Sequence, residues 1–125
     1  MSTQTKRARV VLVDDHPAVL RATADLLARE FEVVAALEHC RGVTALAAAK
    51  QIDLLVLDIS LPELTGIELA ARLKGAGLAP KIVFLTVHCD PDYAHEAFEV
   101  GAMGYVIKPR LASDLIPALR SALAG

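Results

Sequence analysis

The chain has 125 residues, a formal net charge of −2, 54% hydrophobic residues and a mean hydropathy of +0.45. This length is typical of one domain with a substantial hydrophobic core. The charge balance argues against a nucleic-acid-binding surface, and the apolar runs are shorter than the about 20 residues that cross a bilayer. The N-terminal residues contain no signal-peptide core. We therefore predict one cytoplasmic domain over residues 1–125 that binds neither nucleic acid nor membranes.

The N-terminal part of the chain alternates strand-like and helix-like segments. Residues 8–13 (ARVVLV) predict a buried strand that ends in Asp14 and Asp15. A helix is expected from Pro17, because proline is favoured at the first helical position. Residues 31–37 (FEVVAAL) predict a second strand, and the Ala-rich run that follows predicts a short second helix.

The middle of the chain holds its most apolar strand. Four apolar residues in a row within residues 53–58 (DLLVLD) are typical of a strand buried on both faces, as in a parallel sheet. Asp58 stands at the carboxyl end of this strand, where open parallel sheets bind their ligands. Thr65 and Glu68 form a capping box that predicts the start of a third helix, and the glycines at positions 75 and 77 are expected to end it.

The last part of the chain continues the alternation. Residues 81–86 (KIVFLT) predict a fourth strand, and Asp90 with Pro91 predicts the N-cap and first residue of a fourth helix. Residues 104–107 (GYVI) predict a fifth strand, which is followed directly by Lys108.

A fifth helix closes the chain. Its N-cap is predicted at Ser113 or Asp114. Pro117 falls early in this helix and is expected to remove about one backbone hydrogen bond without breaking it.

Five β–α units in alternation predict a doubly wound α/β fold with a parallel five-stranded sheet. In the flavodoxin-like strand order 2-1-3-4-5, the first and third strands are neighbours at the switch point. Asp14, Asp15 and Asp58 would then share one crevice. Two like charges about 4 Å apart repel by about 4 kcal/mol at an effective dielectric near 20. The cluster therefore predicts a bound cation, and Mg²⁺ suits its few carboxylate ligands.

Two further polar side chains come to the same edge of the predicted sheet. Lys108 supplies a point charge suited to a phosphoryl group, and Thr86 can donate one hydrogen bond to a phosphoryl oxygen. An alternative interpretation is that Lys108 is only a solvated charge at a strand end, and that Tyr105 is an ordinary core residue. The histidines have no ligand spacing, so surface or capping positions are expected for His16, His39, His88 and His95.

This combination of motifs resembles the receiver domain of bacterial two-component response regulators over nearly the whole chain. Residues 14–17 (DDHP) and residues 101–108 (GAMGYVIK) are most similar to receivers that precede a LuxR-type helix-turn-helix. No single motif is specific for this family. Their combined order at the ends of the first, third, fourth and fifth strands is specific. The matching residues are Asp14, Asp15, Asp58, Pro62, Gly66, Thr86, Tyr105, Lys108 and Pro109.

The resemblance implies a chemistry for these positions. Asp58 would accept a phosphoryl group from a phosphohistidine of a sensor histidine kinase. Mg²⁺ would be held by Asp15, Asp58 and the backbone carbonyl of Ser60, with Asp14 acting through water. Lys108 and the metal would neutralise the equatorial oxygens.

The resemblance also implies a conformational switch. Thr86 would move toward the phosphate and Tyr105 would turn inward, which shifts a two-state equilibrium. The same resemblance implies a cis peptide between Lys108 and Pro109, and a very small residue after the threonine, where this chain has Val87.

Other functions compete with this interpretation. A pseudo-receiver would act only as a protein-binding module, but the intact Asp15, Asp58, Thr86 and Lys108 count against it. A hydrolase with an aspartate nucleophile would need a second acid where this chain has Ser60. A dinucleotide enzyme is disfavoured because no glycine-rich fingerprint follows the first strand. The predicted domain is thus a signalling switch, with catalysis limited to its own phosphorylation and dephosphorylation.

The sequence also raises questions of assembly. The absence of heptads predicts a monomer or weak dimer before phosphorylation, with partner contacts on the fourth helix, fifth strand and fifth helix. The chain stops at Gly125, just after the last predicted helix, and we expect an output domain, controlling transcription, to follow that residue in a longer regulator.

Overall fold

The computed structural model describes residues 7–49, 52–61, 64–78, 80–87 and 91–125. Each of the five strands lies within one residue of its predicted bounds. The strands are β1 (Arg9–Val13), β2 (Glu32–Leu37), β3 (Leu54–Asp58), β4 (Lys81–Thr86) and β5 (Gly104–Ile107). The helices are α1 (Pro17–Leu27), α2 (Val43–Ala48), α3 (Gly66–Gly75), α4 (Pro91–Glu99) and α5 (Leu111–Ala124).

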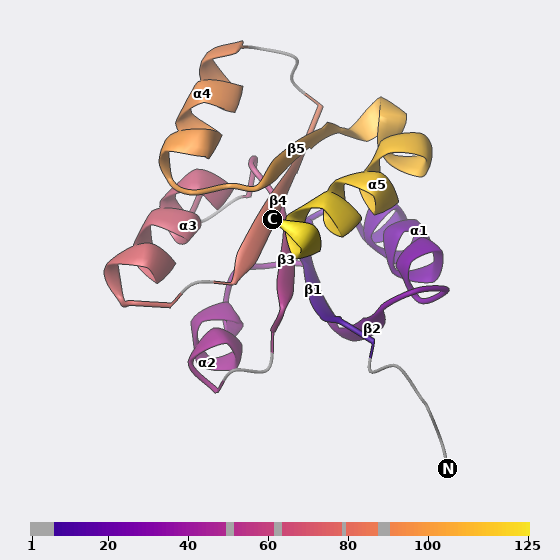
Figure 1. The fold of residues 1–125 in the computed structure, drawn as a ribbon, viewed down its shortest axis with the longest axis horizontal. Coiled ribbons are helices and arrows are strands. Elements are labelled where there is room, and N and C mark those ends of the chain that lie inside the picture. The colour runs from indigo at the N-terminus through magenta and orange to yellow at the C-terminus, as the bar shows by residue number, and fades with distance from the viewer. Residues whose placement is uncertain (1–6, 50–51, 62–63, 79, 88–90) are drawn as a thin grey trace.

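The strands form one parallel sheet in the order β2-β1-β3-β4-β5. Helices α1 and α5 cover one face of this sheet, and α2, α3 and α4 cover the other (Figure 1). This is the flavodoxin-like doubly wound fold that the sequence predicts. The carboxyl ends of all five strands therefore meet at one edge.

The core divides into two clusters because successive residues of a strand point to opposite faces of the sheet. Every residue of β3 is buried, as expected for the central strand of a covered parallel sheet. On the α1 and α5 side the central strands contribute Val10, Leu12, Leu54 and Val56, and on the other side they contribute Val11, Val13, Leu55 and Leu57.

The start and end of α3 follow the predicted local chemistry. The Thr65 hydroxyl accepts a hydrogen bond from the backbone N–H of Glu68, and the Glu68 carboxylate accepts one from the backbone N–H of Thr65, both at 3.1 Å. Such a cap stabilises a helix by about 1 kcal/mol. After the helix, Gly77 has φ of +76°, a conformation that favours glycine.

The predicted start of α5 is wrong. The helix begins at Leu111, because a 3₁₀ turn over Lys108–Arg110 leads directly into it. Ser113 and Asp114 instead lie inside the first turn, where the Ser113 hydroxyl donates to the carbonyl of Arg110. Pro117 lies within the helix, which continues past it to Ala124 as predicted.

The predicted cis peptide between Lys108 and Pro109 is also wrong, since no cis peptide bond occurs among the described residues. The backbone is extended at Ile107 and then enters the 3₁₀ turn at Lys108. From this trans backbone the Lys108 side chain already reaches two aspartates of the sheet edge. A cis bond is therefore not needed to bring the ammonium into place.

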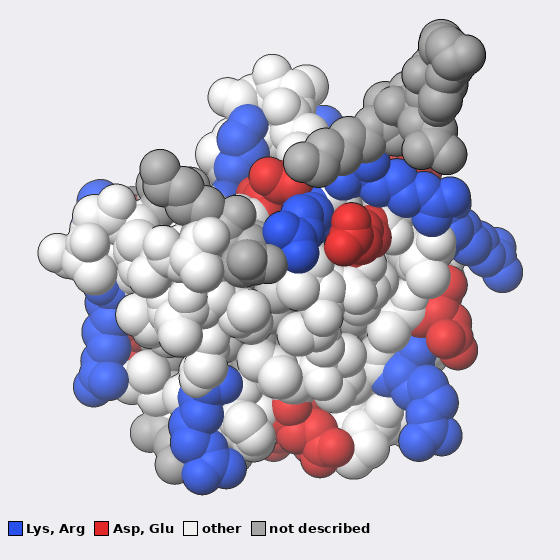
Figure 2. Space-filling model, turned by 90° about the horizontal axis from the view of Figure 1, so that it is seen from below, with Lys and Arg blue, Asp and Glu red and all other residues white. Residues whose placement is uncertain are grey.

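The surface opposite this edge carries mixed charge. Figure 2 shows the face at the amino ends of the strands. Lys, Arg, Asp and Glu side chains are scattered there among uncharged ones, and this view shows no large patch of one sign. Within the described ranges, no helix is long and apolar enough to cross a membrane. Pro62, His88 and the predicted N-cap Asp90 lie outside the described residues.

Candidate functional site

The carboxyl ends of β1 and β3 bring the predicted aspartates together. In the parallel register of these strands, Val13 pairs with Leu57. Asp14 directly follows Val13 and Asp58 directly follows Leu57, so the two aspartates lie side by side. Both are almost completely buried, with 2% of each residue exposed. Buried carboxylates are costly unless they are paired or bind a cation.

Lys108 supplies a counter-charge from the end of β5. Its Nζ lies 2.9 Å from Oδ2 of Asp14 and 3.2 Å from Oδ2 of Asp58, and only 9% of its side chain is exposed. The sequence analysis placed all three residues at one edge, and the structure brings them into direct contact. The interpretation of Lys108 as a merely solvated charge is therefore wrong.

Burial and charge act in opposite directions in this triad. Burial raises the pKa of Asp58 above its ordinary value, although the Ser60 amide and the Lys108 charge act to lower it. Burial alone would lower the pKa of Lys108, but its contact with Asp14 and the charge of Asp58 raise it. Lys108 is therefore a stable cation at neutral pH. Its charge offsets only part of the cost of burying the Asp58 carboxylate.

The backbone around Asp58 is held by two close contacts. The amide of Ser60 donates to Oδ1 of Asp58 at 3.0 Å. A Cβ added at Gly66 would lie 2.4 Å from the carbonyl oxygen of Asp58, and the Gly66 amide donates to the carbonyl of Ile59 at 2.8 Å. Glycine is therefore required where α3 begins, because its backbone packs directly against that of Asp58.

Thr86 and Tyr105 lie on the two strands next to β3. Thr86 is fully buried at the end of β4, one residue beyond Leu85, which pairs with Asp58. Tyr105 pairs with Phe84 across β4 and β5, and its partly buried side chain packs against the core. The structure thus places Thr86 at the site edge, while Tyr105 has the core packing that the sequence analysis gave as its alternative.

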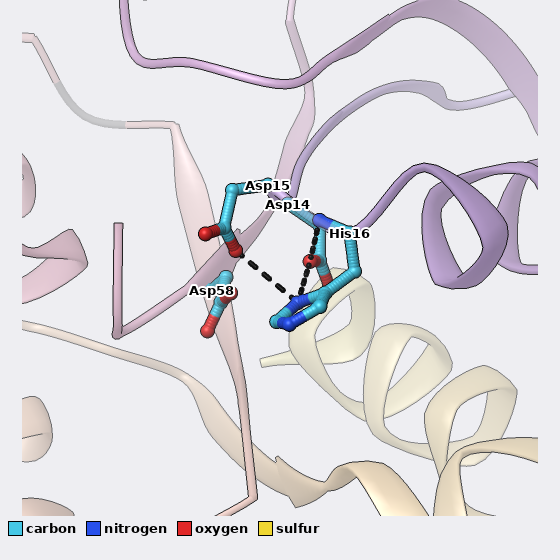
Figure 3. A group of neighbouring side chains, drawn as sticks. All are labelled: Asp14, Asp15, His16 and Asp58. Carbon is cyan, nitrogen blue, oxygen red and sulfur yellow. Dashed lines mark hydrogen bonds and ion pairs between the residues drawn. The ribbon is translucent and has the colours of Figure 1, made fainter. Parts of the chain in front are cut away.

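His16 is a member of the site that sequence reasoning missed. It occupies the N-cap position of α1, although its side chain makes no cap hydrogen bond, and 61% of its side chain is exposed, as expected for a surface position. Its Nδ1 lies 3.2 Å from Oδ1 of Asp14 and 3.2 Å from Oδ1 of Asp15 (Figure 3). Its position immediately after Asp15, at the end of β1, was the signal that could have found it. The other described histidines do not join this cluster.

The cluster fits a small divalent cation. One ligand atom each from Asp14, Asp15, His16 and Asp58 can be chosen so that all lie within 4.8 Å of one another. Oδ2 of Asp14 and Oδ1 of Asp15 are buried and accept no hydrogen bond, although each is close to a basic side chain. Buried carboxylate oxygens with unused lone pairs are the ligands that hard cations prefer.

Comparison with known proteins gives a consistent picture. The family model of the response regulator receiver domain matches residues 10–120. A positive alginate biosynthesis regulatory protein of Pseudomonas aeruginosa is 36% identical over 117 residues, covering 90% of this chain and 46% of that protein. The transcriptional regulatory protein PdtaR of Mycobacterium tuberculosis is 32% identical over 117 residues, covering 93% of this chain and 57% of that protein.

A solved structure agrees with these relatives. The LuxR-family two-component response regulator from Aurantimonas sp. SI85-9A1 superimposes with a TM-score of 0.88 at 34% identity, covering 96% of this chain and 87% of that one. This is the subfamily that the sequence motifs resemble. The chain spans about half the length of the curated relatives it matches.

Proposed function

Because the chain belongs to the response regulator receiver domain family, we propose that it is a phosphorylation-controlled switch whose acceptor is Asp58. The observation that carries this proposal is the buried carboxylate of Asp58, held 3.2 Å from the ammonium of Lys108. Asp58 also lies at the strand edge where doubly wound sheets bind their ligands.

The proposed step is transfer of a phosphoryl group from a phosphohistidine of a sensor histidine kinase. An oxygen of Asp58 attacks the phosphorus, a new O–P bond forms, and the N–P bond breaks to release the imidazole. Asp58 must be ionised to act as the nucleophile. Its raised pKa keeps the carboxylate basic, while the Lys108 charge limits that rise.

The remaining site residues act on the charge of the transferred group. Lys108 stays protonated and contributes a fixed positive charge beside the oxygen that attacks. The Thr86 hydroxyl is proposed to donate a hydrogen bond to a phosphoryl oxygen. Asp15, Asp58 and the carbonyl of Ser60, with Asp14 through water, would hold Mg²⁺, which when bound supplies further neutralisation of the phosphoryl oxygens.

The switch itself is proposed to run through β4 and β5. Movement of Thr86 toward a phosphoryl group would vacate space beside β5, and Tyr105 is half-buried on that strand. Phosphorylation adds negative charge at one point and would bias a two-state arrangement of these side chains. Catalysis is then limited to phosphorylation of Asp58 and the later hydrolysis of the aspartyl phosphate.

We infer the wider role from the relatives. Several curated relatives are named as transcriptional regulators, and the region that matches this chain covers only somewhat more than half of each of them. Residues 1–125 are accordingly proposed to be the receiver unit of a cytoplasmic transcription regulator, with its output domain beyond Gly125. The domain itself is proposed to contact the kinase rather than nucleic acid. A pseudo-receiver without phosphorylation is not favoured, because the acidic residues and Lys108 are all in place.

The test is phosphorylation of the purified domain by a small phosphodonor such as acetyl phosphate. Intact-mass spectrometry should show one added phosphoryl group with Mg²⁺ present and none after chelation with EDTA. Asp58→Asn should accept none while keeping its circular dichroism spectrum, and Asp53→Asn is the matched control at the other end of β3. Full phosphorylation of Asp58→Asn would sink the assignment.

A further inference from the structure

The acidic cluster contains one nitrogen donor that the proposed function does not use. Among the described residues, the only group able to hold a metal comprises Asp14, Asp15, Asp58 and His16. Figure 3 shows the imidazole of His16 beside the carboxylates of Asp14 and Asp15, with the carboxylate of Asp58 nearby. The ring therefore borders the same space that the proposed ion would occupy.

The spacing around His16 fits that of neighbouring metal ligands. Its Nδ1 lies 3.2 Å from one oxygen of Asp14 and 3.2 Å from one oxygen of Asp15. Two adjacent ligands of an octahedral ion, each bonded at about 2.1 Å, are separated by about 3.0 Å. The nitrogen and the Asp15 oxygen thus need to move only slightly to share one ion, while Asp14 can act through water as proposed above.

The ring nitrogen already faces a cation in this arrangement. Nζ of Lys108 lies 3.4 Å from Nδ1 of His16. Nδ1 therefore faces the crevice that Asp14, Asp15 and Lys108 line. A metal ion placed between His16 and the carboxylates would bind the neutral ring through the lone pair of Nδ1.

We propose that Nδ1 of His16 is a metal ligand, and that it makes the site bind a first-row transition ion in preference to Mg²⁺. The inference rests on the proposed function, because it concerns the ion that assists phosphorylation of Asp58. Mg²⁺ prefers oxygen ligands and its own waters. Imidazole nitrogen favours transition ions, whose affinity rises from Mn²⁺ through Co²⁺ to Ni²⁺. His16 is thus the specificity-determining residue of the site.

The experiment compares the affinities of the domain for Co²⁺ and Mg²⁺ by isothermal titration calorimetry with the chloride salts. His16→Ala should weaken Co²⁺ binding by about tenfold or more, since even second-shell partners of metal ligands cost about 10- to 100-fold. Mg²⁺ binding should change by less than about threefold. His95→Ala is the matched control, because His95 is an exposed histidine of α4 that pairs with Glu99.

A second readout reports the ligand directly. The visible absorption of bound Co²⁺ should shift between the wild-type domain and His16→Ala, and should be the same in His95→Ala. Asp15→Asn should abolish the high-affinity Co²⁺ site, which separates it from binding at the Cys40 thiol or other histidines. Equal effects of His16→Ala on both ions, an unchanged absorption spectrum, or Co²⁺ binding retained in Asp15→Asn would each overturn the inference.

Phosphorylation with Mg²⁺ distinguishes this inference from the proposed function. If the wild-type domain accepts a phosphoryl group but His16→Ala keeps the Co²⁺ preference, the His16 assignment alone fails. If the preference is lost in His16→Ala but Asp58 accepts no phosphoryl group, the proposed function fails and the metal ligand stands.

Discussion

Nζ of Lys108 lies 3.2 Å from Oδ2 of Asp58, although the two residues are 50 positions apart in the chain. The contact joins the end of β5 to the end of β3 across the intervening β4. It also ties the 3₁₀ turn before α5 to the central strand. The pair thus connects the proposed acceptor in β3 with the turn that leads from β5 into α5.

Removing this ammonium should destabilise the domain in a pH-dependent way. In Lys108→Met, two buried carboxylates lose their shared cation, and breaking a buried pair of this kind costs about 3–5 kcal/mol. The loss should be large at pH 7 and smaller at pH 4, where Asp58 can bind a proton. Urea unfolding in EDTA measures it. Lys74→Met, on the exposed side of α3, is the control, and an equal loss in both variants would contradict the role of the ion pair.

Replacing the acceptor should have the opposite effect on stability. Burial raises the pKa of Asp58, so the folded domain holds this proton to a higher pH than the unfolded chain does. Stability therefore falls as pH rises from the ordinary aspartate pKa through the folded value. Asp58→Asn lacks this loss, so without metal its melting temperature should exceed that of the wild type at pH 7 and match it at pH 3. A lower melting temperature at pH 7 would show that Asp58 is fully compensated.

Gly66 offers a test of the backbone contact behind the acceptor. In Gly66→Ala the new methyl would lie 2.4 Å from the carbonyl oxygen of Asp58, so the backbone of one segment must shift. We expect a loss of about 1–3 kcal/mol, as for overpacked cores, and slower phosphoryl uptake. Gly75→Ala is the control, because nothing lies within 4 Å of its added Cβ. That variant should be neutral or more stable by up to about 1 kcal/mol.

Much of this site could be predicted because it depends on local patterns and strand order. Asp58 and Thr86 each end an apolar strand, and parallel strands bring such ends to one edge. The features that the sequence analysis missed depend on three-dimensional contacts that the sequence pattern does not show. His16 directly follows Asp14 and Asp15, but its sequence position does not show that its ring turns back onto their carboxylates beside Asp58. The start of α5 was missed because a 3₁₀ turn, rather than a capping side chain, leads into Leu111.

The domain should be a monomer or weak dimer before phosphorylation. The face of α4, β5 and α5 exposes a few large apolar side chains separated by polar ones, and Phe98 is 54% exposed. Scattered apolar residues of this kind are normal on monomers. Sedimentation velocity at micromolar concentration should show one monomeric species. If a tight dimer is found, Phe98→Ser against Leu123→Ser would show whether α4 or α5 carries its interface.

The resemblance to receiver domains implies a very small residue after the threonine, where this chain has Val87, and we expect Val87 to control access to Asp58. It follows Thr86 directly, and 60% of it is exposed. We expect its stiff, branched side chain to stand at the mouth of the crevice beside Asp58, where a phosphodonor or an attacking water must pass it. Small misplacements of an attacking group can cost about 10²-fold in rate. The wild-type domain should therefore accept a phosphoryl group slowly from small donors. The phosphoryl group on Asp58 should then be long-lived.

Val87→Ala should speed both uptake and loss of the phosphoryl group, by up to about 10²-fold. The rates can be followed by intact-mass spectrometry with acetyl phosphate, and then after the donor is removed. His88, outside the described residues, could instead position the attacking water, so His88→Ala is the comparison variant. Steric control by Val87 requires the larger change in Val87→Ala. If that variant keeps both wild-type rates while His88→Ala alters hydrolysis, the histidine and not the valine sets the lifetime of the phosphoryl group.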